Sequence, residues 1–153
     1  MIQTIGMIGT GNMGSAILRG IVEADYVKAG QIVAYDTSSR RIRELEEDIP
    51  GIISARDCIE VAERADLIIL AVKPIYVKDV LDEIHSVLDG KAVLSIAAGW
   101  TVHMLQNALR GTTASYLRVM PNTPALVGEG MTAICDETTF SKEDFDYAKG
   151  IFD

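Results

Sequence analysis

The sequence has few cysteines and few histidines, and these residues are scattered. Its 153 residues include two cysteines, Cys58 and Cys135, which lie far apart and outside any Cys-x-x-Cys spacing. Such isolated cysteines argue against a disulfide framework and against a zinc site. The two histidines, His85 and His103, are isolated as well. We interpret them as structural or surface groups and expect no metal site.

Concentrated positive charge is also missing. The formal net charge is −8, and no run of lysine or arginine interrupts this acidity. We therefore expect neither a nucleic-acid partner nor an anionic membrane partner. The first apolar run starts at residue 2 without a basic segment before it and soon reaches glycines, which is typical of neither a signal peptide nor a transmembrane helix. We expect a cytoplasmic protein.

The sequence does contain a short apolar run that breaks into a Gly-x-Gly-x-x-Gly motif. Residues 4–8 lead into Gly9, Gly11 and Gly14, and the residues that follow are apolar at helical spacing on one predicted face: Met13, Ala16, Ile17, Gly20, Ile21 and Ala24. In a strand, turn and helix of this kind, the first glycine makes the turn, the second lets a pyrophosphate approach the backbone, and the third lets the helix pack closely on the strand. Free N–H groups of the first helical turn would face the phosphates. The motif predicts dinucleotide binding.

The rest of the chain alternates apolar and amphipathic segments. Strands are predicted at residues 4–8, 31–36, 52–54, 67–72, 92–96 and 116–120, with a last edge strand at 131–135. Asp57, Thr101 and Ser141 are placed to cap helices, and the final helix would expose an apolar face near Phe145 and Phe152. We expect one α/β domain over residues 1–153. It would be a Rossmann-type, doubly wound and mainly parallel sheet with helices on both faces and the strand order 3-2-1-4-5-6.

Asp36 closes the second predicted strand, roughly 20 residues after the glycine motif. A carboxylate at this point accepts hydrogen bonds from the adenosine ribose and repels a 2′-phosphate, which favours NAD. Arg40 and Arg41 follow soon after, and their guanidinium groups either suit a 2′-phosphate or belong to a solvated first helical turn. The residues therefore argue for NAD and for NADP.

Four stretches together resemble pyrroline-5-carboxylate reductases, in the right order and spacing. They are Ile-Gly-Thr-Gly-Asn-Met-Gly at 8–14, Leu-Ala-Val-Lys-Pro at 70–74, Ser-Ile-Ala-Ala-Gly at 95–99 and Arg-Val-Met-Pro-Asn-Thr-Pro-Ala-Leu-Val-Gly-Glu-Gly at 118–130. The first is generic and the last is highly specific. The resemblance implies reduction of the imine 1-pyrroline-5-carboxylate to proline, the last step of proline biosynthesis, with NADPH or NADH. It also implies a C-terminal helical dimerisation domain, which we expect to be absent from residues 1–153, and a homo-oligomer for the full-length chain.

The resemblance also implies which residues bind. The pyrophosphate would lie on Gly9, Thr10, Gly11, Asn12, Met13 and Gly14, the adenosine ribose on Asp36 and its neighbours such as Arg40, the nicotinamide ribose on Ala71, Val72, Lys73 and Pro74, and the nicotinamide on Ala97, Ala98 and Gly99. An Asn that touches the cofactor in the family falls near Cys58, so this chain departs from the pattern there. Lys73 either hydrogen-bonds the cofactor or is a solvated residue before a proline. Asn122 lies at the substrate mouth or stabilises a turn.

The sequence identifies no catalytic residue. Hydride transfer to a protonated cyclic imine requires mainly that the nicotinamide C4 be held against the imine carbon. Two alternatives stay open at this point. One is a related dehydrogenase with the same cofactor domain and another substrate, such as a hydroxy acid or a reduced deazaflavin, although residues 120–130 argue against it. The other is a non-enzymatic nucleotide-sensing module.

Overall fold

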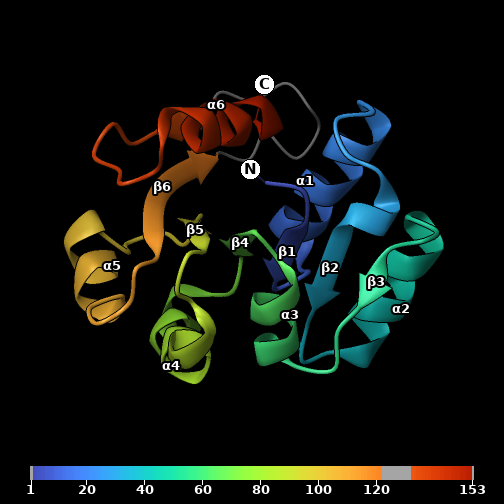
Figure 1. The fold of residues 1–153 in the computed structure, drawn as a ribbon. Coiled ribbons are helices and arrows are strands. Elements are labelled where there is room, and N and C mark those ends of the chain that lie inside the picture. Colours follow the sequence, from blue (N-terminus) through green and yellow to red (C-terminus); the bar gives the residue numbers. More distant parts are fainter. Residues whose placement is uncertain (1, 122–131, 153) are drawn as a thin grey trace.

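The computed structural model describes residues 2–121 and 132–152. Within them, seven strands form one sheet in the order β3-β2-β1-β4-β5-β6-β7 (Figure 1). Strands β1 to β6 pair in parallel, and β7 pairs antiparallel with β6 at the edge. The strands are β1 (Ile5–Ile8), β2 (Ile32–Tyr35), β3 (Ile53–Ser54), β4 (Leu67–Leu70), β5 (Ala92–Ser95), β6 (Ser115–Pro121) and β7 (Thr132–Ile134). The predicted Rossmann-type order and the extra edge strand are confirmed.

Helices cover both faces of this sheet. They are α1 (Asn12–Glu23), α2 (Ser39–Asp48), α3 (Cys58–Arg64), α4 (Pro74–Ile84), α5 (Val102–Ala108) and α6 (Lys142–Ile151), with short 3-10 turns η1 (Ala29–Gln31) and η2 (His85–Val87). Buried residues of α1, α2 and α6 share one apolar cluster with the sheet, and those of α3, α4 and α5 share the other. The sheet is therefore doubly wound, as Figure 1 shows. No helix in the described part of the chain is long and apolar enough to cross a membrane.

Strand β4 lies at the centre of the sheet, as its uniformly apolar sequence predicts. All four of its residues are fully buried, and alternate side chains pack on opposite faces, Leu67 and Ile69 in one cluster and Ile68 and Leu70 in the other. The register aligns Ile8 with both Tyr35 and Leu70, so β1, β2 and β4 end at the same level. This alignment brings the loops that follow these strands to one edge.

The predicted helix caps are confirmed. The side-chain oxygens of Asp57, Thr101 and Ser141 accept hydrogen bonds from the backbone N–H groups three residues further on, at 2.8, 3.1 and 3.1 Å. These bonds satisfy donors that the helix itself leaves unpaired, and so they fix where α3, α5 and α6 begin.

The predicted apolar face of α1 is buried only in part. The buried residues are Gly14, Leu18 and Ile21, whereas Gly20 and Ala24 are exposed. Gly14 fixes the rotation of the helix, because it packs directly against the carbonyl oxygen of Gly9. Positions four and seven residues after it then face the sheet.

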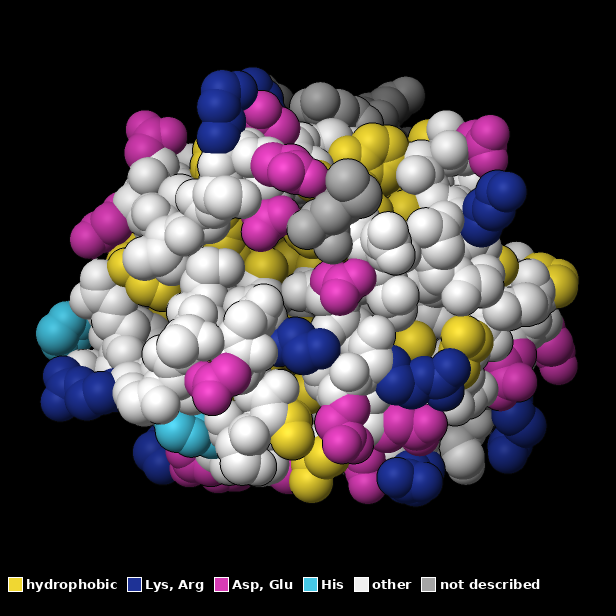
Figure 2. Space-filling model, viewed as in Figure 1, with side chains coloured by type: hydrophobic (Ala, Val, Ile, Leu, Met, Phe, Trp, Pro, Cys, Tyr) yellow, Lys and Arg dark blue, Asp and Glu magenta, His cyan; other side chains and the backbone are white. Residues whose placement is uncertain are grey.

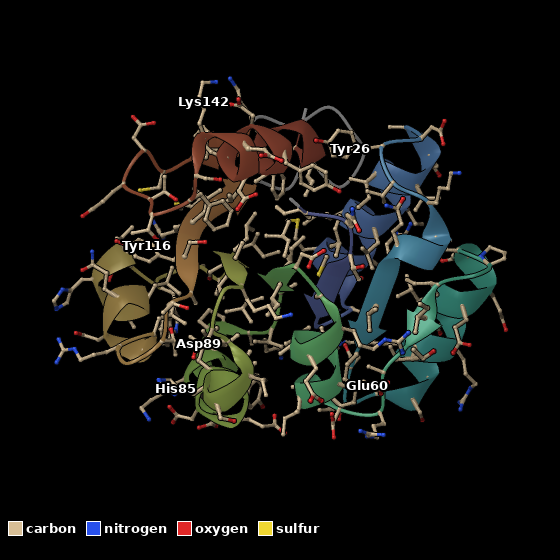
Figure 3. The ribbon with its side chains drawn as sticks, in the orientation of Figure 1. Tyr26, Glu60, His85, Asp89, Tyr116 and Lys142 are labelled. Atoms are coloured by element: carbon tan, nitrogen blue, oxygen red, sulfur yellow. The ribbon has the colours of Figure 1, made fainter. Side chains whose placement is uncertain are left out.

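The prediction that α6 exposes its apolar face is also wrong. Ala148 and Ile151 are buried against the sheet, and Phe145 and Phe152 are partly buried in the same cluster. The segment that follows α1 lies beside this helix (Figure 3), and the hydroxyl of Tyr26 donates a hydrogen bond of 2.8 Å to the carbonyl of Tyr147. The helix is docked because these segments, distant in sequence, supply its apolar partners.

Candidate functional site

The loops after β1, β2, β4 and β5 enclose a cleft of about 1110 Å³. Small-molecule pockets typically measure roughly 300–1,000 Å³, so this cleft has room for an extended ligand. The residues that line it are Ile8, Gly9, Gly11, Asn12, Met13, Tyr35, Asp36, Thr37, Arg41, Cys58, Ala71, Val72, Lys73, Pro74, Tyr76, Asp79, Val80, Glu83, Ile96, Ala97 and Ala98.

Two glycines of the motif are required by the fold itself. Gly9 has a φ of +99°, and a Cβ there would lie 2.7 Å from the carbonyl carbon and oxygen of Ala71. A Cβ on Gly14 would overlap the carbonyl oxygen of Gly9. The first glycine therefore makes the turn and the last one lets α1 approach it, as the motif predicts.

Gly11 differs from the other two glycines. Its φ of −69° is accessible to any residue, and among the described residues a Cβ there would meet nothing nearer than Nη1 of Arg41, at 3.5 Å. Gly11 is also the N-cap residue of α1, which has neither a side-chain cap nor an acidic residue in its first turn. The described fold does not need a glycine at this position. Open space in front of uncapped N–H groups fits the approach of an anionic ligand such as a pyrophosphate.

Asp36 lies at the end of β2, as predicted, but its carboxylate is occupied by protein groups. Oδ2 accepts hydrogen bonds from the backbone N–H of Thr10 at 2.8 Å and from the Thr10 hydroxyl at 3.1 Å. Oδ1 accepts one from the backbone N–H of Ser38 at 2.8 Å. The side chain is 7% exposed. The carboxylate thus connects the glycine turn to the turn after β2.

The two arginines that follow Asp36 point to different places. Arg40 lies near Glu44, with 3.9 Å between Nε and Oε1, and does not line the cleft. Arg41 does line the cleft, and its Nη1 lies 3.9 Å from Oδ2 of Asp36. Lys73, which ends the loop before α4, is a second cation among the residues that line it. The described part of the cleft therefore presents Arg41 and Lys73 to an anion, in place of the predicted Arg40.

The side of the cleft that α4 lines was missed by the sequence analysis. Tyr76, Asp79, Val80 and Glu83 come from α4 and line the cleft together with Tyr35 and Cys58. Burial, together with the charge and hydrogen bond of the Glu83 carboxylate, raises the pKa of the Cys58 thiol from its ordinary value near 9.0 to about 12. The thiol is protonated at neutral pH and is a poor nucleophile. These four residues of α4 recur at intervals of three and four positions, so they share one face of the helix. This spacing was the signal in the sequence that could have identified this side of the cleft.

The other predicted site residues divide as follows. Asn12, Met13, Ala71, Val72, Pro74, Ala97 and Ala98 line the cleft, whereas Thr10, Gly14 and Gly99 do not. Thr10, which lies between Gly9 and Gly11, is 2% exposed, and both its backbone N–H and its hydroxyl donate to Asp36. Asn122 lies outside the described residues. Within residues 2–121 and 132–152, no three His, Cys, Asp or Glu side chains are grouped to hold a metal ion.

The strand order, the glycine turn and the cleft at the carboxyl edge define a Rossmann-type dinucleotide-binding domain. The chain belongs to the family described as NADP oxidoreductase, coenzyme F420-dependent, which matches residues 4–99.

The resemblance noted in the sequence is confirmed over nearly the whole chain. The chain is 44% identical to the pyrroline-5-carboxylate reductase of Escherichia coli K12 over 145 residues, which are 94% of this chain and 53% of that protein. It is 32% identical to pyrroline-5-carboxylate reductase 2 of Bacillus subtilis over 152 residues, 99% of this chain and 54% of that protein. The chain therefore spans about half the length of the curated relatives it matches.

Solved structures agree with this comparison. Plasmodium falciparum pyrroline carboxylate reductase with NADP bound matches with a TM-score of 0.84 and 32% identity, over 97% of this chain and 53% of that one. A pyrroline-5-carboxylate reductase from Coxiella burnetii matches with a TM-score of 0.89 and 31% identity, over 98% of this chain and 55% of that one. The chain is homologous to the N-terminal, NAD(P)-binding domain of these reductases.

Proposed function

We propose that residues 1–153 are the cofactor domain of an NAD(P)H-dependent reductase that converts 1-pyrroline-5-carboxylate to proline. The observation that carries this proposal is the 44% identity to the Escherichia coli reductase over 94% of the chain. The family match to F420-dependent NADP oxidoreductases ends at residue 99, so it covers mainly the cofactor-binding loops. The longer match favours the imine substrate.

The residues of the cleft fit a bound dinucleotide. The uncapped start of α1 and the open side of Gly11 would receive the pyrophosphate. Lys73 would hydrogen-bond the nicotinamide ribose or amide, while Ala97 and Ala98, whose side chains are small, would leave room for the ring. The bound nicotinamide supplies the hydride. The chain's own contribution is to hold it in place, with no acid or base required from the described residues, because a protonated imine is already electrophilic.

The substrate side of the proposal uses groups beyond the described cleft. We assign Asn122 to the substrate mouth. We expect a homo-oligomer for the full-length protein in the cytoplasm, with no nucleic-acid or membrane partner.

On the face in Figure 2, Lys and Arg side chains are interspersed with Asp and Glu and form no single basic patch. This mixture on one face, together with a net charge of −8 for the whole chain, favours small-molecule chemistry over binding to a polyanion.

The test is to measure dinucleotide binding and turnover with the same protein. We expect micromolar or tighter binding of NADPH or NADH by calorimetry, and slow oxidation of the bound cofactor when 1-pyrroline-5-carboxylate is added. For a protein of residues 1–153 alone, which spans about half the length of the Escherichia coli enzyme, we expect turnover at least about a hundredfold below that of the whole enzyme, or roughly 2.7 kcal/mol of barrier.

Two results would contradict the proposal, each in favour of a stated alternative. Binding without any turnover, in this chain and in a longer form matched in length to the relatives, would support a nucleotide-sensing module. Oxidation of a reduced deazaflavin by NADP⁺, with no reaction of the imine, would support the activity that the family description names.

A further inference from the structure

Two neighbouring loops of the cleft carry the residues assigned to the nicotinamide half of the cofactor. Residues 71–74 follow β4, residues 96–98 follow β5, and both sets line the cleft. The sheet holds the two loops together at their bases, where the backbone N–H of Ile96 donates to the carbonyl of Leu70 at 3.2 Å. Further out, the spacing of the loops depends on contacts beyond the strand ladder.

Trp100 connects these two loops. Its indole Nε1 donates a hydrogen bond of 2.9 Å to the carbonyl of Pro74, the first residue of α4. Among the hydrogen bonds of the described residues, this is the one that joins the loops past Ile96. Trp100 is 8% exposed and belongs to the apolar cluster of α3, α4 and α5. The bond is therefore shielded from water, which strengthens it.

The residues before Trp100 form a tight turn that is itself anchored. The backbone N–H of Trp100 donates to the carbonyl of Ala97 at 3.4 Å and closes the turn. Gly99, its third residue, has a φ of +78°, as the third position of a type II turn requires. The fully buried Ser95 accepts a hydrogen bond from the backbone N–H of Ala97 at 3.3 Å. The loop after β5 is thus held by its own strand and, through Trp100, by α4.

The start of α4 has few other attachments. Lys73, its N-cap residue, makes no side-chain cap hydrogen bond, and Pro74 has no N–H to donate. The next two residues, Ile75 and Tyr76, are 76% and 53% exposed, so packing holds this turn only weakly. The bond from Trp100 therefore fixes where this turn lies, and with it Lys73.

We propose that Trp100 is a positioning residue whose indole N–H sets the spacing of the loops after β4 and β5, and with it the space for the nicotinamide riboside. This inference rests on the proposed cofactor function. Trp100 is not among the residues that line the cleft, so it acts through Pro74 and Lys73. Such control matters because a misplacement of about 1 Å, caused far from the chemistry, can slow a reaction about a hundredfold.

The experiment removes the indole N–H and compares two ligands by calorimetry. One is NADPH, and the other is adenosine 2′,5′-bisphosphate, which is NADPH without its nicotinamide nucleotide. Trp100→Phe should raise the Kd of NADPH about fivefold and change that of the bisphosphate less than about twofold. If the wild type binds only NADH, then NADH and AMP form the corresponding pair.

Tyr116→Phe is the matched control. Tyr116 is also 8% exposed and lies in the same cluster, and its hydroxyl accepts a hydrogen bond of 2.7 Å from Nε2 of Gln106, but it does not line the cleft. This substitution also removes one shielded hydrogen bond and leaves a phenyl ring. It should lower the melting temperature and leave both Kd values within about twofold of wild type.

The fluorescence of bound NADPH gives a readout that a loss of stability alone would not change. With the dihydronicotinamide excited directly and the protein saturated, the emission of the complex should fall in Trp100→Phe and stay the same in Tyr116→Phe. Trp100 is the only tryptophan of the sequence, so β-(3-benzothienyl)alanine supplied in place of tryptophan changes this side chain alone. It replaces the N–H by sulfur in a ring of nearly the same shape. This form should reproduce the effects of Trp100→Phe, and it serves in its place if that variant does not fold.

Three results would overturn the positioning role. Equal increases in both Kd values would mean that Trp100 supports the domain in general. Unchanged Kd values and emission in Trp100→Phe would mean that the loops keep their spacing without it. Wild-type behaviour of the benzothienyl form would mean that ring volume, and not the N–H, sets the spacing. In all three cases the wild-type chain still binds a dinucleotide and the proposed function stands, whereas a wild-type chain that binds neither NADPH nor NADH would contradict the proposed function itself.

Discussion

Gly9 and Ala71 lie in direct backbone contact across the carboxyl ends of β1 and β4, so close that a Cβ on Gly9 would lie 2.7 Å from the Ala71 carbonyl. The turn after one strand is thus shaped by the loop after its neighbour. Gly11, two residues further on, has no such contact with a backbone atom among the described residues. The two glycines of one motif therefore differ: the fold requires Gly9, and we propose that Gly11 serves binding.

Alanine at each of these positions separates the two roles. Gly9→Ala should lower the free energy of unfolding by about 2–4 kcal/mol, because it combines a positive φ with an overlap against Ala71. Gly11→Ala should leave that free energy within about 1 kcal/mol of wild type and raise the Kd of NADPH at least about tenfold. Urea unfolding and calorimetry measure the two effects. Wild-type affinity in a folded Gly11→Ala protein would show that no phosphate approaches this turn.

The cleft cation Lys73 should contribute to cofactor affinity in a salt-dependent way. Lys73→Ala should raise the Kd of NADPH roughly threefold to tenfold, the effect of losing about 0.7–1.4 kcal/mol from a charged contact of an exposed residue. Lys78→Ala is the control, since Lys78 lies on α4 outside the cleft lining and donates to Asp82 at 2.8 Å. Fluorescence titration at low and at high salt provides the measurement. An equal effect of both substitutions would indicate only a change in net charge.

Cys58 should make the stability of the domain depend on pH in the alkaline range. Burial, together with the neighbouring Glu83 carboxylate, raises the pKa of its thiol from near 9.0 to about 12, so the folded state binds the proton more tightly than the unfolded state does. The associated stability is fully present below about pH 9 and is lost as the pH rises toward 12, by up to about 1.4 kcal/mol per pH unit. The difference in unfolding free energy between wild type and Cys58→Ala, followed from pH 7 upward, should show this slope. A pH-independent difference would contradict the buried, protonated thiol.

The docking of α6 can be tested at Gly150, where a Cβ would overlap the hydroxyl of Tyr26 and lie 2.7 Å from its Cζ. Gly to Ala in an exposed helix usually stabilises by about 1 kcal/mol. Here Gly150→Ala should instead destabilise by about 1 kcal/mol, because Tyr26 must leave its hydrogen bond to Tyr147. In a Tyr26→Ala background the same substitution should become stabilising. Thermal unfolding of wild type, the two single variants and the double variant shows whether Gly150→Ala stabilises or destabilises in each background. If its effect has the same sign with and without Tyr26, Tyr26 moves aside without cost.

Much of the fold was predictable because its signals are local. The glycine motif, the uniformly apolar β4 and the caps at Asp57, Thr101 and Ser141 each depend on a few consecutive residues and their intrinsic geometry. The strand order followed from these elements, because right-handed crossovers leave few alternatives. Loops that follow parallel strands meet at one edge, and this placed most of the predicted binding residues in the cleft.

The sequence by itself thus determined the class of fold, the position of the cleft and the relationship to pyrroline-5-carboxylate reductases. Only the tertiary structure decided which neighbouring side chain faces that cleft. Arg40 and Arg41 are adjacent in sequence, but about 100° separate successive residues around a helix, and the rotation of α2 is set by the burial of Leu45. In the same way, the carboxylate of Asp36 is engaged because folding brings Thr10, which is distant in sequence, within hydrogen-bond reach. Such contacts depend on packing between elements, which no local pattern encodes.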